Sequence, residues 1–126
     1  MTAQELTLKE MCARFDVTPR TLRHYEYIEL LTPRRAGRAR YYGAREMARM
    51  KLILRGRRFG FSLEEIRQWL LLYDEDRSTR RQMEVWIAAA GQQIAELQSR
   101  RLQLDEAIRE LEDLREIARR ELDGRG

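Results

Sequence analysis

Side chains that could read a nucleic acid gather between residues 18 and 27. If a helix begins there, its outward face carries Thr18, Arg20, Arg23, His24 and Tyr27. Guanidinium groups fork onto phosphates and onto guanine edges, and hydroxyl and imidazole groups can hydrogen-bond to either. The chemistry of this face therefore predicts contact with double-stranded DNA.

The sequence contains no set of residues that predicts catalysis or metal binding. Cys12 is the only cysteine and His24 the only histidine, so one chain can form neither a disulfide nor a multi-cysteine metal site. The sequence also lacks a nucleophile–base pair, a glycine-rich phosphate loop and paired carboxylates. We expect no enzyme, no metal and no cofactor. Cys12 is then a small core residue, and His24 a DNA-facing or solvated one.

Positive charge is concentrated in the half of the chain that contains this segment. Residues 1–72 carry 15 Lys and Arg against 8 Asp and Glu, a net +7, whereas residues 73–126 carry 10 against 13, a net −3. Nearly all of the positive charge is arginine. The N-terminal half is therefore the half that we expect to meet an anion.

Two short helices are predicted to present the outward face. Thr7 and Glu10 have the spacing of a capping box, and apolar residues at helical spacing follow them. The second helix is predicted to begin at Thr18-Pro19, with the threonine as its cap and the proline at its first position.

The residues between and within these helices have the spacing of a helix-turn-helix. Cys12 is small where the two helices must touch, Asp16 tolerates the turn, and Leu22 can plug the core. The second helix of such a motif enters the major groove by its N-terminus. This spacing predicts that residues 18–27 form a recognition helix.

The rest of the basic half is predicted to form a hairpin and two more helices. Residues 30–42 place strand-like runs on either side of a basic turn. Helices are predicted over about 44–58 and from a capping box at Ser62–Glu65 to about residue 72. We assign residues 1–73 to the first domain, residues 74–79 to a polar linker, and residues 80–126 to a helix with a short tail. Side chains near the end of the fourth helix are interpreted as core, with a small-ligand pocket at a dimer interface as the alternative: Trp69, Leu70 and Tyr73.

A coiled coil is predicted from about residue 80 to 122. This stretch has no proline and one glycine, and ten of twelve seam positions in a 3–4 repeat are apolar. A helix of roughly 60 Å is too long to bury its stripe on the first domain, so we expect it to pair with a second copy rather than fold back. Arg101 and Arg115 on the seam either fix the register or extend to solvent. The residues predicted to form the dimer interface are Ile87, Ile94, Leu97, Leu104, Ile108 and Leu111.

Three motifs carry a family resemblance: VTPRTLRHYEYIELLTP (17–33), RYY (40–42) and LRGRRFGFSLEEI (54–66). Together they resemble the DNA-binding domain of the MerR family of bacterial transcription regulators, over residues 6–74. The sequence departs from the family at Asp16, where a turn glycine is usual, and at His24, where tyrosine is common. Residues 50–74 resemble a subgroup that regulates leucine/isovalerate and fatty-acid catabolism.

The resemblance implies a mainly α-helical protein, with a winged helix-turn-helix followed by a long helix that dimerises antiparallel. Family members bind a near-palindromic promoter operator and distort it so that RNA polymerase can use the promoter, and some act as repressors. Two recognition helices would then lie one duplex turn apart, roughly 34 Å. For Tyr25, packing and DNA contact are equally weighted, and the 34–40 run is alternatively a solvated loop. The implied DNA-binding residues are Thr18, Arg20, Arg23, His24, Tyr25, Arg38, Arg40, Tyr42, Arg57 and Arg58.

The main alternative function is that of an adaptor, in which the coiled coil mediates interaction and the basic face binds RNA or an acidic protein. Apolar stretches are too short to cross a bilayer, and the N-terminus lacks a basic segment followed by an apolar core. We therefore expect a cytoplasmic protein without a membrane partner. No separate ligand domain is predicted, so any small-molecule effector would bind at the dimer interface, the linker or the helix ends.

Overall fold

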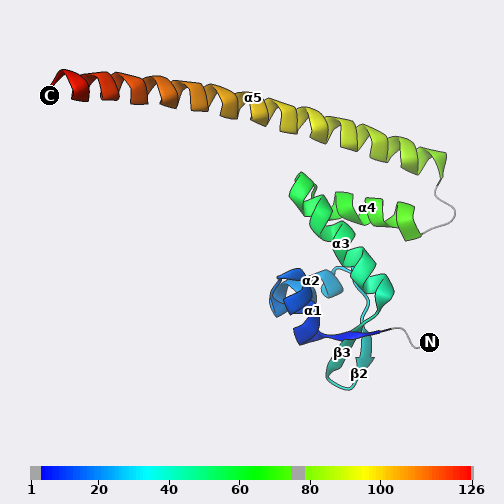
Figure 1. The fold of residues 1–126 in the computed structure, drawn as a ribbon. Helices are drawn as coiled ribbons and strands as arrows, with labels where there is room; N and C mark the ends of the chain where they lie inside the picture. The colour runs from blue at the N-terminus through cyan, green and yellow to red at the C-terminus, as the bar shows by residue number, and fades with distance from the viewer. Residues whose placement is uncertain (1–3, 75–78, 126) are drawn as a thin grey trace. The chain divides into compact units, whose positions relative to one another are not determined.

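The computed structural model describes residues 4–74 and 79–125, which are mostly helical (Figure 1). They divide into two compact units, Met1–Met83 and Glu84–Gly126. The linker predicted at residues 74–79 lies largely outside the described residues.

The helix-turn-helix predicted from the spacing is present. Helix α1 (Leu8–Phe15) begins with the predicted capping box, because the Thr7 N–H donates to Glu10 Oε1 at 2.9 Å and the Glu10 N–H donates to Thr7 Oγ1 at 3.2 Å. These hydrogen bonds lower the pKa of Glu10. Asp16 ends α1 with a left-handed φ of 52°, as the turn requires. Helix α2 (Pro19–Tyr27) is capped by Thr18, whose hydroxyl accepts from the Thr21 N–H at 3.1 Å.

A small antiparallel sheet forms the wing. Strands β2 (Arg34–Ala36) and β3 (Ala39–Tyr42) make the predicted hairpin, which turns at Gly37 with a φ of +62°. Strand β1 (Leu6–Thr7) pairs with the other edge of β3, so that the order is β1-β3-β2. We did not expect β1 from the sequence. Because β1 directly precedes α1, its pairing with β3 connects the start of α1 to the wing.

Helices α3 (Ala44–Phe59) and α4 (Leu63–Asp74) complete the first unit. Their predicted boundary is confirmed, because the Ser62 N–H and the Glu65 N–H bond reciprocally to each other's side chains, at 3.0 and 3.2 Å. The two helices approach closely at Gly56, where an added Cβ would lie 2.6 Å from Ile66 Cγ1. The lack of a side chain at residue 56 therefore sets the packing distance between α3 and α4.

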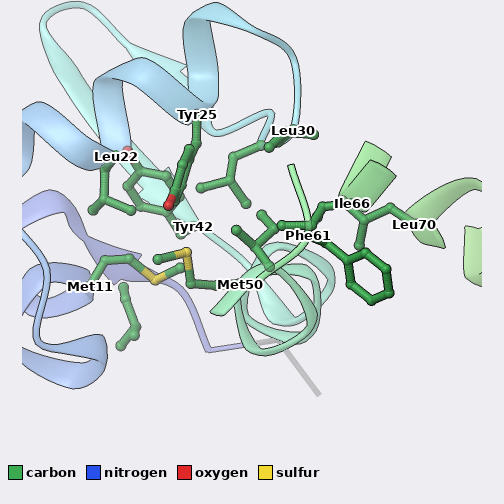
Figure 2. Packing of buried hydrophobic residues seen from close by; sticks show 12 residues of the cluster. Met11, Leu22, Tyr25, Leu30, Tyr42, Met50, Phe61, Ile66 and Leu70 are labelled. Atoms are coloured by element: carbon green, nitrogen blue, oxygen red, sulfur yellow. The ribbon is translucent and has the colours of Figure 1, made fainter. Parts of the chain in front are cut away.

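One apolar cluster joins the elements of the first unit other than β2 (Figure 2). Leu22 is fully buried and contributes the predicted plug, while Cys12 is half-buried against the cluster. Such contiguous burial is the main source of stability in a small domain. The labelled core residues in Figure 2 are Met11, Leu22, Tyr25, Leu30, Tyr42, Met50, Phe61, Ile66 and Leu70.

Most of helix α5 (Arg80–Gly124) lies in the second unit, and α5 is a single helix of 45 residues and therefore about 67 Å. Its start has a capping box that we did not predict, between Thr79 and Gln82. None of its residues is buried in the single chain. No described helix is long and apolar enough to cross a membrane. The exposed large apolar residues on α5 include all six predicted interface residues: Ile87, Ile94, Leu97, Leu104, Ile108 and Leu111.

Candidate nucleic-acid interface

The outward face of α2 is polar and open to solvent. Arg20, Arg23 and His24 are exposed, as is Thr18 at the cap, and Tyr27 is 85% exposed. Leu22 and Tyr25 on the opposite side are buried, so the helix is fixed to the core by one face. The arrangement leaves two guanidinium groups and an imidazole free to meet a ligand.

The arginines of the first unit fall into two groups, those that bind protein acceptors and those that do not. Across residues 4–74 and 79–125, no ion pair or side-chain hydrogen bond involves the five arginines that the sequence assigned to DNA on α2, at the wing tip and at the end of α3. A guanidinium without a protein partner keeps all its donors for an external anion. These five residues are Arg20, Arg23, Arg38, Arg57 and Arg58.

The wing arginines next to the tip are held by acidic residues. Glu26, on α2, accepts from Arg40 Nε at 2.7 Å through one oxygen and from Arg35 through the other. Arg34 binds Glu5 through two nitrogens and lies 4.6 Å from the centre of the Tyr41 ring. Glu5 raises the pKa of Arg34.

Arg40 was predicted to contact phosphate, but in the structure its guanidinium is engaged by Glu26. Only 23% of its side chain is exposed. Sequence reasoning missed both acids that hold wing arginines, Glu5 and Glu26. The only available signal was the presence of two carboxylates within a strongly basic segment.

The recognition helix and the wing border an open basic hollow of about 410 Å³. It lies between the exposed face of α2 and the hairpin β2–β3. Since guanidinium donors converge there and the backbone at Gly37 is bare, the hollow has the chemistry of a phosphate site. Its lining residues are Arg23, Arg35, Gly37, Arg38, Ala39 and Arg40.

Two tyrosines assigned to DNA contact lie in the core instead. Tyr42 is fully buried, and burial raises the pKa of its phenol. Its hydroxyl has no hydrogen-bond partner among the described residues. Tyr25 is 7% exposed, which favours packing in the core over DNA contact. The assignment of the Tyr42 side chain to phosphate is corrected: its position at the end of β3 points it inward, opposite Leu6.

The backbone that follows α2 is held by charged side chains from α3 and α4. The buried Glu46 accepts from the Thr32 N–H at 2.9 Å, and Arg49 Nε donates to the Leu30 carbonyl at 2.8 Å. Burial lowers the pKa of Arg49. Arg67 donates to the Ile28 carbonyl. These contacts tie the backbone after α2 to α3 and α4, whereas carbonyls in the last turn of α2 accept from the backbone N–H groups of Ile28, Glu29 and Leu30.

Arg57 and Arg58 lie in the last turn of α3 and are exposed. A helix C-terminus carries partial negative charge, which these side chains also offset. At the end of α3 they therefore stabilise that helix and present two guanidinium groups that bind no other described residue.

No group of three or more His, Cys, Asp and Glu residues that could hold a metal ion occurs in the described part of the chain.

Comparison with known proteins matches both halves of the chain to one family. Residues 6–72 match the family described as "MerR HTH family regulatory protein", and residues 47–114 match the family described as "MerR, DNA binding". The HTH-type transcriptional regulator HmrR of Rhizobium leguminosarum bv. viciae is 36% identical over 112 residues, which cover 87% of this chain and 78% of that protein.

Solved structures have the same fold. A MerR-family transcriptional regulator from Bacillus cereus gives a TM-score of 0.69 at 23% identity, over 87% of this chain and 79% of that one. The transcription regulator PbrR691 from Ralstonia metallidurans CH34, solved with lead(II), gives 0.61 at 29% identity, over 87% and 85% of the two chains.

Proposed function

The chain belongs to the MerR family of helix-turn-helix regulatory proteins and is a DNA-binding transcription regulator, and we propose that it acts as a homodimer on a near-palindromic promoter operator. We further propose that it distorts the promoter so that RNA polymerase can use it. As a regulator of promoter DNA, it would work in the bacterial cytoplasm.

The observation that carries the proposed interface is a set of guanidinium groups, on three elements of one unit, that have no partner among the described residues. Arg20 and Arg23 lie on α2, Arg38 at the wing tip, and Arg57-Arg58 at the end of α3. A recognition helix supplies base contacts, and flanking cations supply phosphate contacts. We propose that Arg20, Arg23 and His24 read bases while Thr18, Arg38, Arg57 and Arg58 position the backbone.

Dimerisation through α5 is supported by its exposed apolar stripe. Most of the stability of a helix in a protein comes from packing of its apolar face, and α5 buries none of its residues in the single chain. A second copy of α5 supplies a matching stripe, and it also supplies a second recognition helix for the other half of a palindrome.

Heavy-metal sensing is not proposed for this chain. The lead(II) named for the Ralstonia protein is a property of that protein. Here the only cysteine, Cys12, lies half-buried in α1, and one thiol does not make a metal site.

The test begins with selection of the operator from genomic fragments, followed by titration of the full chain with operator and random duplexes. Arg23→Ala should weaken operator binding by roughly ten- to a hundredfold, because one bidentate base contact is worth about 1–3 kcal/mol. Arg38→Ala should weaken both duplexes alike and reduce the log–log salt slope by about 0.9 for each protomer, about 1.8 for the dimer.

Arg120→Ala is the matched control, since it removes an arginine from α5 that is paired with Glu116. It should leave the affinity and the salt slope unchanged. Unaltered operator binding by Arg23→Ala would refute the assignment of α2. Equal affinity for duplex RNA and operator DNA would favour the adaptor function.

A further inference from the structure

Glu26 is the only acidic residue of α2, and it lies on the side of the helix that meets the wing. Its side chain is 11% exposed, and its two oxygens bind two different arginines of the hairpin. An acid so close to a DNA-binding face opposes the attraction that the surrounding arginines provide. Its presence there needs a physical reason.

The register of the wing supplies one. Arg35 and Arg40 are paired residues of β2 and β3, so two positive charges lie directly across the ladder. Like charges in that position repel each other. Glu26 bridges them, and the three side chains together carry one positive charge rather than two.

A carboxylate and a phosphate use guanidinium donors in the same way. Both present two oxygens to the fork of an arginine. Glu26 therefore competes with a DNA phosphate for Arg35 and Arg40, and it does so within the molecule. Of the four arginines that line the hollow between α2 and the wing, only Arg23 and Arg38 are left without a protein acceptor among the described residues.

We propose that Glu26 is a positioning residue that determines specificity, because it keeps Arg35 and Arg40 from phosphates and thereby lowers affinity for non-operator DNA. The inference rests on the proposed function. Sequence-independent affinity grows with the number of neutralised phosphates, whereas discrimination depends on base contacts. By binding these two arginines, Glu26 lowers the sequence-independent affinity. The same contacts hold the wing against α2, which positions the recognition helix for base contacts.

The test measures the affinity of the full chain for operator and random duplexes over a salt series. Glu26→Gln keeps the shape of the side chain and removes its charge. Random-duplex affinity should rise roughly eightfold at 0.1 M salt for each arginine released to a phosphate, with the log–log slope steeper by about 0.9. The ratio of operator to random affinity should fall.

Glu5→Gln is the matched control. Glu5 also holds a wing arginine, but Arg34 does not line the hollow. This variant should leave the salt slope unchanged. The double variant Glu26→Gln/Arg40→Gln leaves only Arg35 to be released, so its random-duplex slope should lie between those of the wild type and of Glu26→Gln. Glu26→Asp, which restores the charge on a shorter stem, should recover the slope and only part of the specificity ratio.

Three results overturn the inference. One is an unchanged random-duplex slope in Glu26→Gln, while Arg38→Ala still lowers the slope. Another is an equal loss of operator and random affinity together with a lower melting temperature, which would make Glu26 merely structural. The third is an equal effect of Glu5→Gln. A wild-type chain with no preference for operator would instead refute the proposed function.

Discussion

The two units of the chain differ in where their apolar side chains lie. The first unit buries a cluster that includes residues from every one of its elements except β2, with Leu22, Met50 and Ile53 fully inaccessible. Helix α5 has an apolar stripe of comparable chemistry and buries none of it in the single chain. The first unit therefore specifies its own fold, whereas α5 specifies an association. The proposed binding of two half-sites by one dimer would require both kinds of sequence.

The largest expected effect comes from a charge in the α5 stripe. Leu97→Asp should abolish dimerisation at micromolar concentration, because a carboxylate on a coiled-coil seam is desolvated on pairing. Operator affinity should fall by at least about a hundredfold, since the two half-sites are no longer bound by one linked molecule. Light scattering and operator titration measure the two effects.

Ser99→Asp is the control for this change, since Ser99 lies two residues further along α5 and outside the seam. It should preserve both the dimer and operator binding. A Leu97→Asp protein that remains dimeric would remove the distinction between the two units.

The next largest effect is expected in the core of the first unit. Ile53→Ala should lower the free energy of unfolding by about 2–5 kcal/mol, through lost burial and the cavity left behind. The two tryptophans can report on the two units separately, because Trp69 lies in α4 and Trp86 in α5. In a Trp86→Phe background, Trp69 fluorescence during urea unfolding reports on the first unit.

The same deletion on the stripe makes the comparison sharper. Leu104→Ala should weaken association and make the unfolding midpoint of α5 more dependent on protein concentration. The Ile53→Ala shift in the first unit should be nearly the same at all concentrations. Equal concentration dependence at both sites would mean that the first unit is not autonomous.

A smaller effect is expected where the first unit stores backbone strain. Glu29 has a φ of 64°, a left-handed conformation that costs a residue with a Cβ about 1 kcal/mol. Glu29→Gly should therefore stabilise the first unit by up to about 1 kcal/mol in the same urea assay. Ala48→Gly, on an exposed part of α3, should destabilise it by roughly 0.5–1 kcal/mol. If both changes destabilise the unit, Glu29 is not strained.

The smallest effect at neutral pH is expected at Tyr42. Tyr42→Phe removes a buried hydroxyl without a described partner, so the stability should change by less than about 1 kcal/mol. Burial raises the folded-state pKa of Tyr42 above 10.0, so its contribution to stability is present below that pH and lost as pH rises through the folded-state pKa. Wild type should lose more stability than Tyr42→Phe between about pH 9 and 11. A lower salt slope for DNA binding by Tyr42→Phe would restore its assignment to phosphate.

Features that depend on near neighbours in the chain could be predicted from the sequence. The caps at Thr7, Thr18 and Ser62 each bond to a group three residues away, and the left-handed turn depends on Asp16 alone. The family was also evident from motifs in order. The boundaries of α1 to α4 follow from such local signals.

Features that depend on distant parts of the chain could not be predicted. Strand β1 has two residues and exists only because β3 lies beside it. The inward direction of Tyr42 follows from that pairing. The contact of Glu26 with Arg40 spans 14 residues, and that of Glu5 with Arg34 spans 29. Charge counts show that acidic residues lie among the arginines, but they do not show which arginine each acidic residue binds.

The side chains of Glu46, Arg49 and Arg67 form a clamp on the backbone after α2. This clamp affects the timescale on which α2 opens. A helix of nine residues is marginal by itself, and its last turn would normally exchange amide hydrogens rapidly. Here the Thr32 amide donates to buried Glu46, and Arg49 and Arg67 hold the carbonyls before it. The Thr32 amide can then exchange only when α3 releases the clamp. Recognition helix and α3 should therefore open as one cooperative unit, with a shared protection factor at α2 and at the buried face of α3.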